Sequence, residues 1–401
     1  MLPLEGIRVL DLGRIVAGPF ATQMLGDLGA EVIKVERPGA GDLSREYGPS
    51  FLKEPDGGSV SGFYLSFNRN KKSISVNLAS AEGQQLIRDL AAHCDVFIEN
   101  FKCGDLAHKG LGYDDVVKIN PGIVYCSITG FGQTGPYASY PGLDMVFQAM
   151  SGLMSVTGEA AGAPQKVGIT AADILCGLYA SNAIMAALRA RDRDGGQGQY
   201  IDMSLFDCAV AAMSHRATDY FLMGEAPMRS GNVAPGSTPA QVFTCSDGLL
   251  NLQAASDTQF LTFCKAIDRP ELAQDPRFSQ RKTRHENRAE LLPILEDVLR
   301  QDTVAHWYER LVPQGVICSP IYDLEQTFHD PQVIARGLQT AMERAEGDPA
   351  STVRNPIRYS RTPIERYAFP PQTGAHTDAI LSDLLGLSDA ELLALHEADT
   401  I

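Results

Sequence analysis

The first 42 residues contain the pattern that most constrains the fold, because strand and helix signals alternate there at the spacing of a βαβ unit. The segment 7–12 (IRVLDL) is apolar enough for a buried strand, and the apolar periodicity over 19–28 predicts a helix. Gly29 stands where a helix C-cap belongs, and 31–35 (EVIKV) predicts a second strand. This order predicts parallel pairing, in which the carboxyl ends of the strands face a ligand crevice.

The same alternation continues through the first 130 residues. Helices are predicted over 80–92 and 114–120, and strands over 95–99 (DVFIE) and 122–128 (GIVYCSI). Four strands separated by helices predict an α/β fold. We therefore expect a Rossmann-like, doubly wound parallel sheet in a large domain.

A change of pattern in the second half predicts another domain. Apolar helices are expected over 172–191 and 204–223, after which short strands at 242–245, 249–254 and 315–321 are accompanied by charged helices. The tail contains several prolines and cannot form a core alone. The predicted divisions are a large domain over 1–224, a smaller α+β domain over 225–322, and a C-terminal segment, 323–401, that returns to the large domain.

Composition restricts the partners and the location. The 34 Lys and Arg residues against 49 Asp and Glu give a net charge of −15, which disfavours nucleic acid and an anionic membrane as partners. The opening residues, MLPLEG, lack the basic and apolar pattern of a leader, and no window reaches the 18–20 apolar residues expected of a membrane span. We expect a cytoplasmic protein.

Neither a metal nor a dinucleotide is expected. The eight cysteines form no C-x-x-C pair, which favours buried free thiols over disulfides or a metal site, and the eight histidines show no metal-binding spacing. The first turn lacks G-x-G-x-x-G, so NAD is not predicted. A literal match at 130–135 is followed by Pro136 and favours a turn-rich loop over a nucleotide cradle.

Asp173 is the candidate reactive residue, because it is the only charged residue between 167 and 188. Such a carboxylate is either the N-cap of the helix that begins near 174 or a group held at low dielectric for reaction, and the two roles are compatible. Asp144 also begins an apolar run and is interpreted as a cap or a supporting residue.

Basic and aromatic residues follow the predicted strands. Arg37 comes directly after 31–35 and suits a phosphate or an adenine face, with a solvated strand end as the alternative. Asn100, Phe101 and Lys102 follow the strand at 95–99 and either stack on and bind an adenine or form a plain connection. His108 and Lys109 add positive charge nearby.

Together these segments resemble the class III CoA-transferase family, also called CaiB/BaiF, over nearly the whole chain. The resemblance implies an interlocked homodimer, with Asp173 as the nucleophilic carboxylate. It also implies that CoA or acyl-CoA is bound as a substrate, without metal or NAD. The matching segments are 6–42, 68–78 (NRNKKSISVNL), 95–101 (DVFIENF), 110–138, the Asp173 segment, 196–207 (GQGQYIDMSLFD) and 374–381 (GAHTDAIL). The implied CoA contacts are Val16, Ala17, Arg37, Val76, Asn100, Phe101, Lys102 and His108.

The implied activity is exchange of CoA between an acyl-CoA, with succinyl-CoA as the expected donor, and a small carboxylic or dicarboxylic acid. The route passes through an aspartyl mixed anhydride and an aspartyl-CoA thioester, with oxyanion donors from the loops at 16–18 and 231–238. Arg14, Val16 and His108 depart from the oxalate-type members, and Leu143 replaces a histidine of the racemase branch. The alternatives are an α-methylacyl-CoA racemase type of isomerase, a transferase for carnitine-like or oxalate acceptors, and a silent CoA-binding subunit.

Overall fold

The computed structural model describes residues 1–53, 58–344, 347 and 349–401. They form two compact units, of which the larger consists of Met1–Met154, Lys166–Glu225 and Arg336–Ile401, and the smaller of Ser155–Gln165 and Ala226–Ala335.

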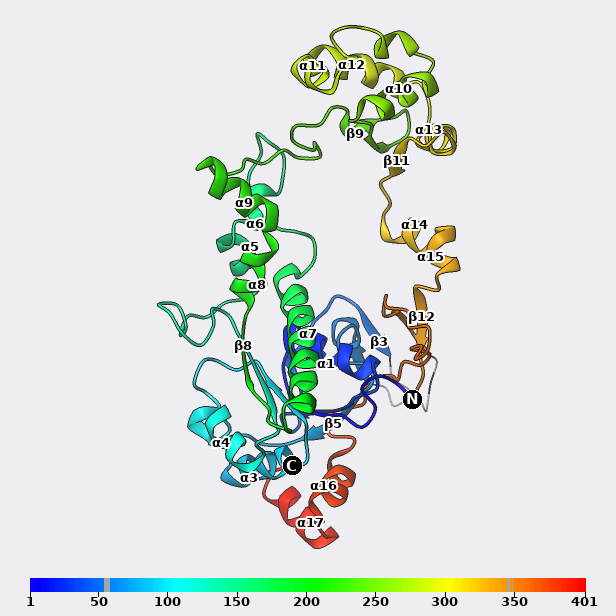
Figure 1. Ribbon diagram of the computed structural model, residues 1–401. Coiled ribbons are helices and arrows are strands. Elements are labelled where there is room, and N and C mark those ends of the chain that lie inside the picture. Colours follow the sequence, from blue (N-terminus) through cyan, green and yellow to red (C-terminus); the bar gives the residue numbers. More distant parts are fainter. Residues whose placement is uncertain (54–57, 345–346, 348) are drawn as a thin grey trace. The chain divides into compact units, whose positions relative to one another are not determined.

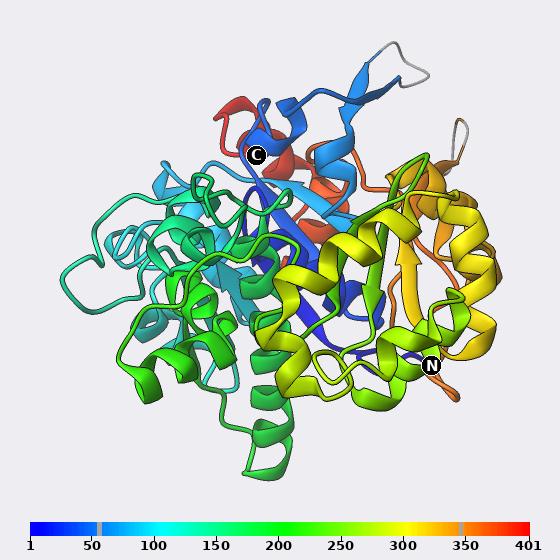
Figure 2. The same ribbon diagram turned by 90° about the horizontal axis from the view of Figure 1, so that it is seen from above.

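A six-stranded sheet organises the larger unit, and its strands are all parallel (Figures 1 and 2). Across the sheet the strands lie in the order β5-β2-β1-β6-β7-β8. Numbered along the chain, this order is 3-2-1-4-5-6, so its direction reverses between β1 and β6. The strands are β1 (Arg8–Leu12), β2 (Glu31–Glu36), β5 (Lys71–Ser75), β6 (Val96–Glu99), β7 (Val124–Thr129) and β8 (Tyr200–Ser204). The α/β fold and the parallel sheet are therefore as predicted.

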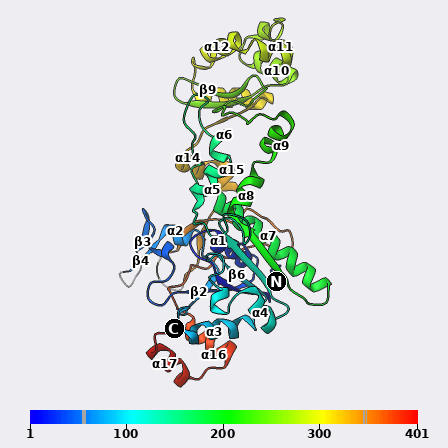
Figure 3. The same ribbon diagram turned by 90° about the vertical axis from the view of Figure 1, so that its left-hand side faces the viewer.

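Helices cover both faces of this sheet, because successive strand residues point to opposite sides. Val9 packs with α1, α7 and α8, whereas its neighbour Leu10 packs with α3, α4, α16 and α17. Figure 3 shows these two groups of helices on opposite sides of the strands. The helices of the first face are α1 (Ala17–Asp27), α7 (Ala171–Arg193) and α8 (Leu205–Ala212), and those of the second are α3 (Ala81–Ala91), α4 (Tyr113–Ile119), α16 (Thr377–Leu385) and α17 (Asp389–Glu397).

Shorter elements complete the larger unit. Strand pairs β3–β4 and β12–β13 are antiparallel. A small core that includes Tyr64, Met342 and Tyr367 joins the segment after β2 to the C-terminal segment. These elements are β3 (Phe51–Lys53), β4 (Ser59–Ser61), α2 (Gly62–Leu65), α5 (Asp144–Met150), α9 (Ser214–Met223), β12 (Gln339–Met342) and β13 (Ala350–Val353), while α6 (Leu153–Val156) lies at the boundary of the units.

The smaller unit is a three-stranded antiparallel sheet covered by helices, which are yellow-green to yellow in Figure 2. Its core includes Phe243 and Leu250 from the sheet and Phe263, Leu295 and Trp307 from the helices. The elements are β9 (Ala240–Thr244), β10 (Leu249–Gln253), α10 (Asp257–Ala266), α11 (Arg281–Glu286), α12 (Arg288–Leu299), α13 (Val304–Leu311), β11 (Ile317–Pro320), α14 (Leu324–His329) and α15 (Pro331–Ala335).

The limits of the smaller unit differ from the predicted range of 225–322. It extends to Ala335, because α14 and α15 belong to it, and it includes Ser155–Gln165. Arg229 joins this inserted segment to the rest, since its guanidinium donates hydrogen bonds to the carbonyl oxygens of Ser155, Glu159 and Gly162 at 2.7–3.3 Å.

Three elements differ from the predictions. Strand β5 was not predicted, because Lys71 and Lys72 obscure the strand pattern, yet Lys71 is buried and paired with Asp11. The helix predicted over 204–223 is divided into α8 and α9, and Ser214, the first residue of α9, has a φ of 42°. The expectation that no segment resembles a membrane span is wrong for α7, which at 23 residues passes by length and composition.

Helix α7 nevertheless packs within the larger unit. Half of its most apolar 18-residue window is buried inside the structure, and the core helix of a soluble protein passes the same test. Its small residues permit a close approach to α1, because a Cβ built on Gly177 would lie 2.9 Å from the carbonyl oxygen of Ala17. The helix predicted over 172–191 corresponds to α7 to within two residues at each end.

Candidate functional site

The first site feature is the loop between β1 and α1. Strands β1 and β6 are neighbours at the point where the strand order reverses, and their following helices α1 and α4 lie on opposite faces. In open α/β sheets the crevice at this point, outside the carboxyl ends of the strands, is where ligands bind. Residues 13–16 follow β1 and residues 100–103 follow β6, so both loops border the crevice.

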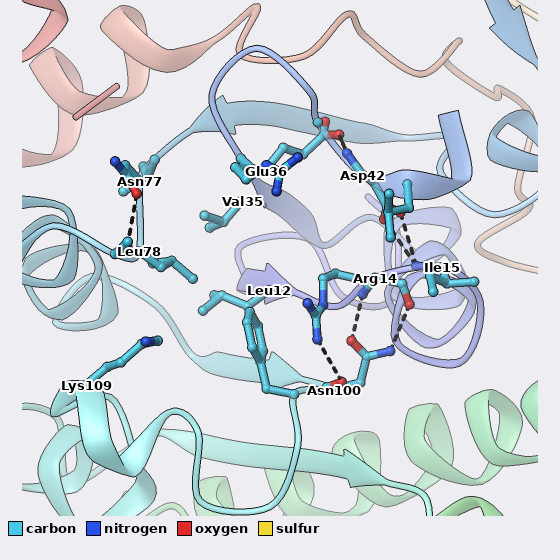
Figure 4. Close-up of a pocket in the computed structure, with 16 residues that line it drawn as sticks. Leu12, Arg14, Ile15, Val35, Glu36, Asp42, Asn77, Leu78, Asn100 and Lys109 are labelled. Atoms are coloured by element: carbon cyan, nitrogen blue, oxygen red, sulfur yellow. Dashed lines mark hydrogen bonds between the residues drawn. The ribbon is translucent and has the colours of Figure 1, made fainter. Parts of the chain in front are cut away.

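A cavity of about 430 Å³ opens at these strand ends (Figure 4). Leu12, Val35 and Val76 give it an apolar part, while Arg37 and Lys109 also line it. In Figure 4 the Lys109 side chain extends towards the centre of the cavity. An apolar surface beside cations suits a planar heterocycle that carries phosphate groups.

Arg14 is a further cation of this cavity. Its guanidinium lies over the Phe101 ring, with Cζ 3.9 Å from the ring centroid. Burial lowers the pKa of Arg14, and Asp42 and Glu99 partly oppose this effect. A partly desolvated cation gains more from an incoming anion than a fully hydrated one does.

A second cavity, of about 240 Å³, adjoins the first and contains Asp173 and Asp144 in its lining. Arg14, Ile15, Asn100 and Phe101 line both cavities. The two cavities therefore share one wall.

Asp173 lies in the first turn of α7, but it is not the cap of that helix as one interpretation of the sequence required. The cap comes from Asp144, whose Oδ1 accepts the Ala172 N–H at 2.8 Å. Gln148 steadies this carboxylate, because its Nε2 donates to Asp144 Oδ2 at 2.6 Å and its Oε1 accepts the Val167 N–H at 2.9 Å. Asp144 is thus a cap, as predicted, although for a helix 27 residues further along.

Within the described residues, no group donates a hydrogen bond to the Asp173 carboxylate. Burial and, to a smaller extent, the negative charge of Asp144 together raise its pKa to about 7. A carboxylate without hydrogen-bond donors is poorly stabilised as an anion and is correspondingly reactive as a nucleophile. This group can attack an electrophilic carbonyl placed in the second cavity.

The turn after β6 is fixed by another buried carboxylate. Glu99 accepts the Phe101 N–H at 2.7 Å and a short hydrogen bond from the Ser127 hydroxyl. Burial raises the pKa of Glu99 to about 7. These bonds set the position of Asn100 and Phe101 at the wall between the cavities.

Most of the predicted CoA contacts surround these cavities. His108 lies outside both linings, on an exposed turn, and the adjacent Lys109 lines the first cavity instead. Asn77 and Asp42 also line the first cavity and were not singled out from the sequence, since neither stands in a chemically distinctive pattern. The predicted residues that line one or both cavities are Val16, Ala17, Arg37, Val76, Asn100, Phe101 and Lys102.

Metal-binding geometry is not found in the described ranges, where no group of three or more His, Cys, Asp or Glu side chains is arranged to hold an ion. The eight cysteines are free, and all but Cys103 are buried. The G-x-G-x-x-G match at 130–135 lies in a loop after β7 and does not begin a helix, and Gly130 lines the second cavity.

Comparisons with known proteins agree on one family. The model of CoA-transferase family III matches residues 4–377. The chain is 43% identical over 400 residues to succinyl-CoA:glutarate CoA-transferase of Homo sapiens, covering 100% of this chain and 90% of that protein. It is 42% identical over 388 residues to succinate–glutarate CoA-transferase of Agrobacterium fabrum, covering 95% and 96% of the two chains.

A solved structure shows the same fold. The crystal structure of a CaiB/BaiF family protein from Brucella suis superposes with a TM-score of 0.87 at 40% sequence identity, covering 96% of this chain and 99% of that one.

Proposed function

The chain belongs to CoA-transferase family III, and from this premise we propose that it exchanges CoA between succinyl-CoA and a small dicarboxylic acid of the glutarate type. The names of the two relatives above support this choice of donor and acceptor. The observation that carries the mechanism is the partly buried Asp173 carboxylate, which has a raised pKa and lines a cavity beside the larger one.

The first half of the exchange moves CoA onto the enzyme. The Asp173 carboxylate attacks the thioester carbonyl of succinyl-CoA, the carbon–sulfur bond breaks, and a mixed anhydride and CoA thiolate form. The thiolate then attacks the Asp173 carbonyl of the anhydride, which releases succinate and leaves an aspartyl-CoA thioester. No net proton is required, because a carboxylate enters and a carboxylate leaves.

The second half repeats these steps in reverse order with the acceptor. A glutarate carboxylate attacks the aspartyl thioester and gives a new anhydride and CoA thiolate. The thiolate attacks the glutaryl carbonyl, which yields glutaryl-CoA and restores the Asp173 carboxylate. The thioester free energy is conserved, since no step releases an activated acyl group to water.

Each tetrahedral intermediate develops an oxyanion that needs donors. Helix α1 begins at Ala17, and the first N–H groups of a helix have no partner within it. Val16 and Ala17 line the cavity of Asp173, so their N–H groups are the proposed donors.

The larger cavity fits the nucleotide part of CoA. Leu12, Val35 and Val76 offer apolar surface to the adenine, and Arg37 and Lys109 offer charge to the phosphates. The cavity of Asp173 then receives the thioester end, which we assign from the shared wall of the two cavities.

A homodimer is part of the proposal. Large apolar side chains stay exposed on α9, where Phe221, Leu222 and Met223 expose 69–82% of their surfaces, and such surface marks an interaction site. Light scattering on the purified protein tests this, with a dimer expected and a monomer contradicting it. The free cysteines support a reducing, cytoplasmic location.

The test of the proposed function is an exchange assay with separated CoA esters. The protein is incubated with succinyl-CoA and, in turn, glutarate, malate, oxalate or carnitine. Glutaryl-CoA is expected to appear in step with the loss of succinyl-CoA, and Asp173→Ala is expected to abolish it. Failure to exchange with any acid, by protein that binds CoA, would contradict the proposal. Incorporation of solvent deuterium at the α-carbon of an acyl-CoA would indicate an isomerase instead.

A further inference from the structure

The backbone of Gly13 and Arg14, in the loop after β1, is held by side chains from three different strands or loops of the larger unit. Asp11 accepts the Gly13 N–H at 2.8 Å, and Lys34 Nζ donates to the Gly13 carbonyl oxygen at 2.7 Å. Asn100 accepts the Arg14 N–H and donates to the Arg14 carbonyl oxygen, both at 2.8 Å. These contacts fix the residues that immediately precede the strained position in this loop.

Ile15 is the strained position. Its φ is 68°, in the left-handed region that β-branched residues avoid because the side chain collides with its own backbone. Its N–H is held by the Asp42 carboxylate, at 3.2 and 3.3 Å from the two oxygens. Backbone strain persists only where the surroundings enforce it, and it concentrates at functional sites.

Asp42 is itself held firmly. Its side chain is almost fully buried and pairs with Lys34 Nζ at 2.9 Å, while the Ser44 N–H and hydroxyl both donate to its Oδ1 at 2.9 Å. Lys34 keeps the pKa of Asp42 low, at about 2, despite burial. A buried ion pair contributes little to stability after its desolvation cost, so its presence here favours a role in fixing one conformation.

The strained loop leads directly to the atoms that the reaction needs. Ile15 lines both cavities, and Val16 and Ala17 follow it at the amino end of α1. Resting on the proposed function, we propose that Asp42, held by Lys34, is a positioning residue that keeps Ile15 in its left-handed conformation and thereby orients the Val16 and Ala17 N–H groups towards the thioester oxygen beside Asp173.

The test compares kcat and KM for succinyl-CoA in Asp42→Asn, Ile15→Gly and the double variant. Asp42→Asn removes the charge that binds Lys34, and we expect kcat to fall 10- to 100-fold with KM changed less than threefold. Glycine occupies the left-handed region without strain, so a chain with Ile15→Gly no longer depends on Asp42 to enforce that conformation. Added to Asp42→Asn, it is expected to restore at least a fifth of the parent kcat.

Asp27→Asn is the matched control. Asp27 forms a comparable buried ion pair with Arg69 at 2.6 Å, at the far end of α1. We expect this variant to lose stability and to retain the kcat of the parent per folded molecule. If Asp42→Asn does not fold, Ser44→Ala weakens the hold on the same carboxylate and is expected to lower kcat three- to tenfold.

Two results would overturn the inference while leaving the proposed function intact. One is an unchanged kcat in folded Asp42→Asn or Ser44→Ala. The other is an inactive Asp42→Asn protein that Ile15→Gly does not restore although it binds CoA normally. Absence of exchange by the unmodified protein would instead contradict the proposed function. Hydrogen exchange of the peptide that covers 13–17 gives a readout apart from activity, and we expect it to be faster in Asp42→Asn only.

Discussion

Replacing Asp173 with asparagine is expected to stabilise the protein while abolishing CoA exchange. The isosteric amide cannot ionise and is a far weaker nucleophile than a carboxylate. Removing the ionised form also removes an unfavourable interaction, since burial and the charge of Asp144 raise the pKa of Asp173 from 3.8 to about 7.

The size of the gain follows from that pKa. A rise from 3.8 to about 7 corresponds to about 4 kcal/mol against the ionised folded form above pH 7. Asparagine leaves its own buried polar atoms without partners, at a cost of about 1–2 kcal/mol. The expected net gain at pH 8 is therefore about 2 kcal/mol.

The dependence on pH has a definite direction. Because the folded pKa lies above the unfolded one, the folded protein keeps a proton that the unfolded chain loses between pH 3.8 and about 7. The free energy of unfolding of the parent falls as the pH rises through this window. In Asp173→Asn residue 173 does not titrate, so this part of the fall is absent. The advantage of the variant should grow by about 2–3 kcal/mol between pH 5 and pH 8.

Denaturant unfolding at pH 5 and pH 8 measures this difference. Asp383→Asn, at an exposed carboxylate on α16, is the control and is expected to change stability by less than about 0.5 kcal/mol at both values. A variant less stable than the parent at pH 8, or an advantage equal at the two pH values, would refute the reasoning.

Four further substitutions test separate parts of the larger unit. Asp144→Asn keeps an acceptor for the Ala172 N–H but removes the charge that raises the pKa of Asp173. The acid limb of the pH profile of kcat/KM should therefore move to lower pH. An acid limb at the same pH as in the parent would contradict an effect of Asp144 on Asp173. Lys109→Gln should weaken CoA binding about tenfold by calorimetry, equivalent to about 1.4 kcal/mol, and His108→Gln less than twofold, since only Lys109 of the two lines the cavity. The reverse order would restore His108 as the contact. Gly177→Ala should lower stability by about 1–3 kcal/mol, because its Cβ would lie 2.9 Å from the Ala17 carbonyl oxygen, and a neutral effect in thermal unfolding would show that α1 and α7 separate freely.

The central strands could be predicted because a strand that is buried on both faces appears in the sequence as a run of consecutive apolar residues. Both faces of a doubly wound sheet are covered, so residues 32–35 of this strand form an apolar run interrupted only by Lys34. Strand β5 was not predicted because a lysine is not expected in a buried strand. Lys71 is buried here because its Nζ donates a hydrogen bond to Asp11 Oδ2 at 3.0 Å, and Asp11 lies 60 positions earlier in the chain. Local patterns do not record such a pairing.

The site could be predicted in part for the same reason. Asp173 is conspicuous in the sequence as one charge within a long uncharged run. The contacts that support it are conspicuous only in space, since Asp144 caps α7 from 28 residues away and Asn100 holds Arg14 from 86 residues away. Likewise, the choice between His108 and Lys109 depends on which side of a turn faces the cavity, and neighbouring residues share the same sequence pattern.

Mass spectrometry of the trapped enzyme tests the central claim, that Asp173 carries CoA during the exchange. The protein is mixed with succinyl-CoA, treated with borohydride, which reduces a thioester to an alcohol, and digested with trypsin. The peptide 167–189 contains Asp173 as its only acidic side chain. We predict conversion of that residue to homoserine, dependent on succinyl-CoA. Modification of a different carboxylate, or none in protein that exchanges CoA, would contradict the account.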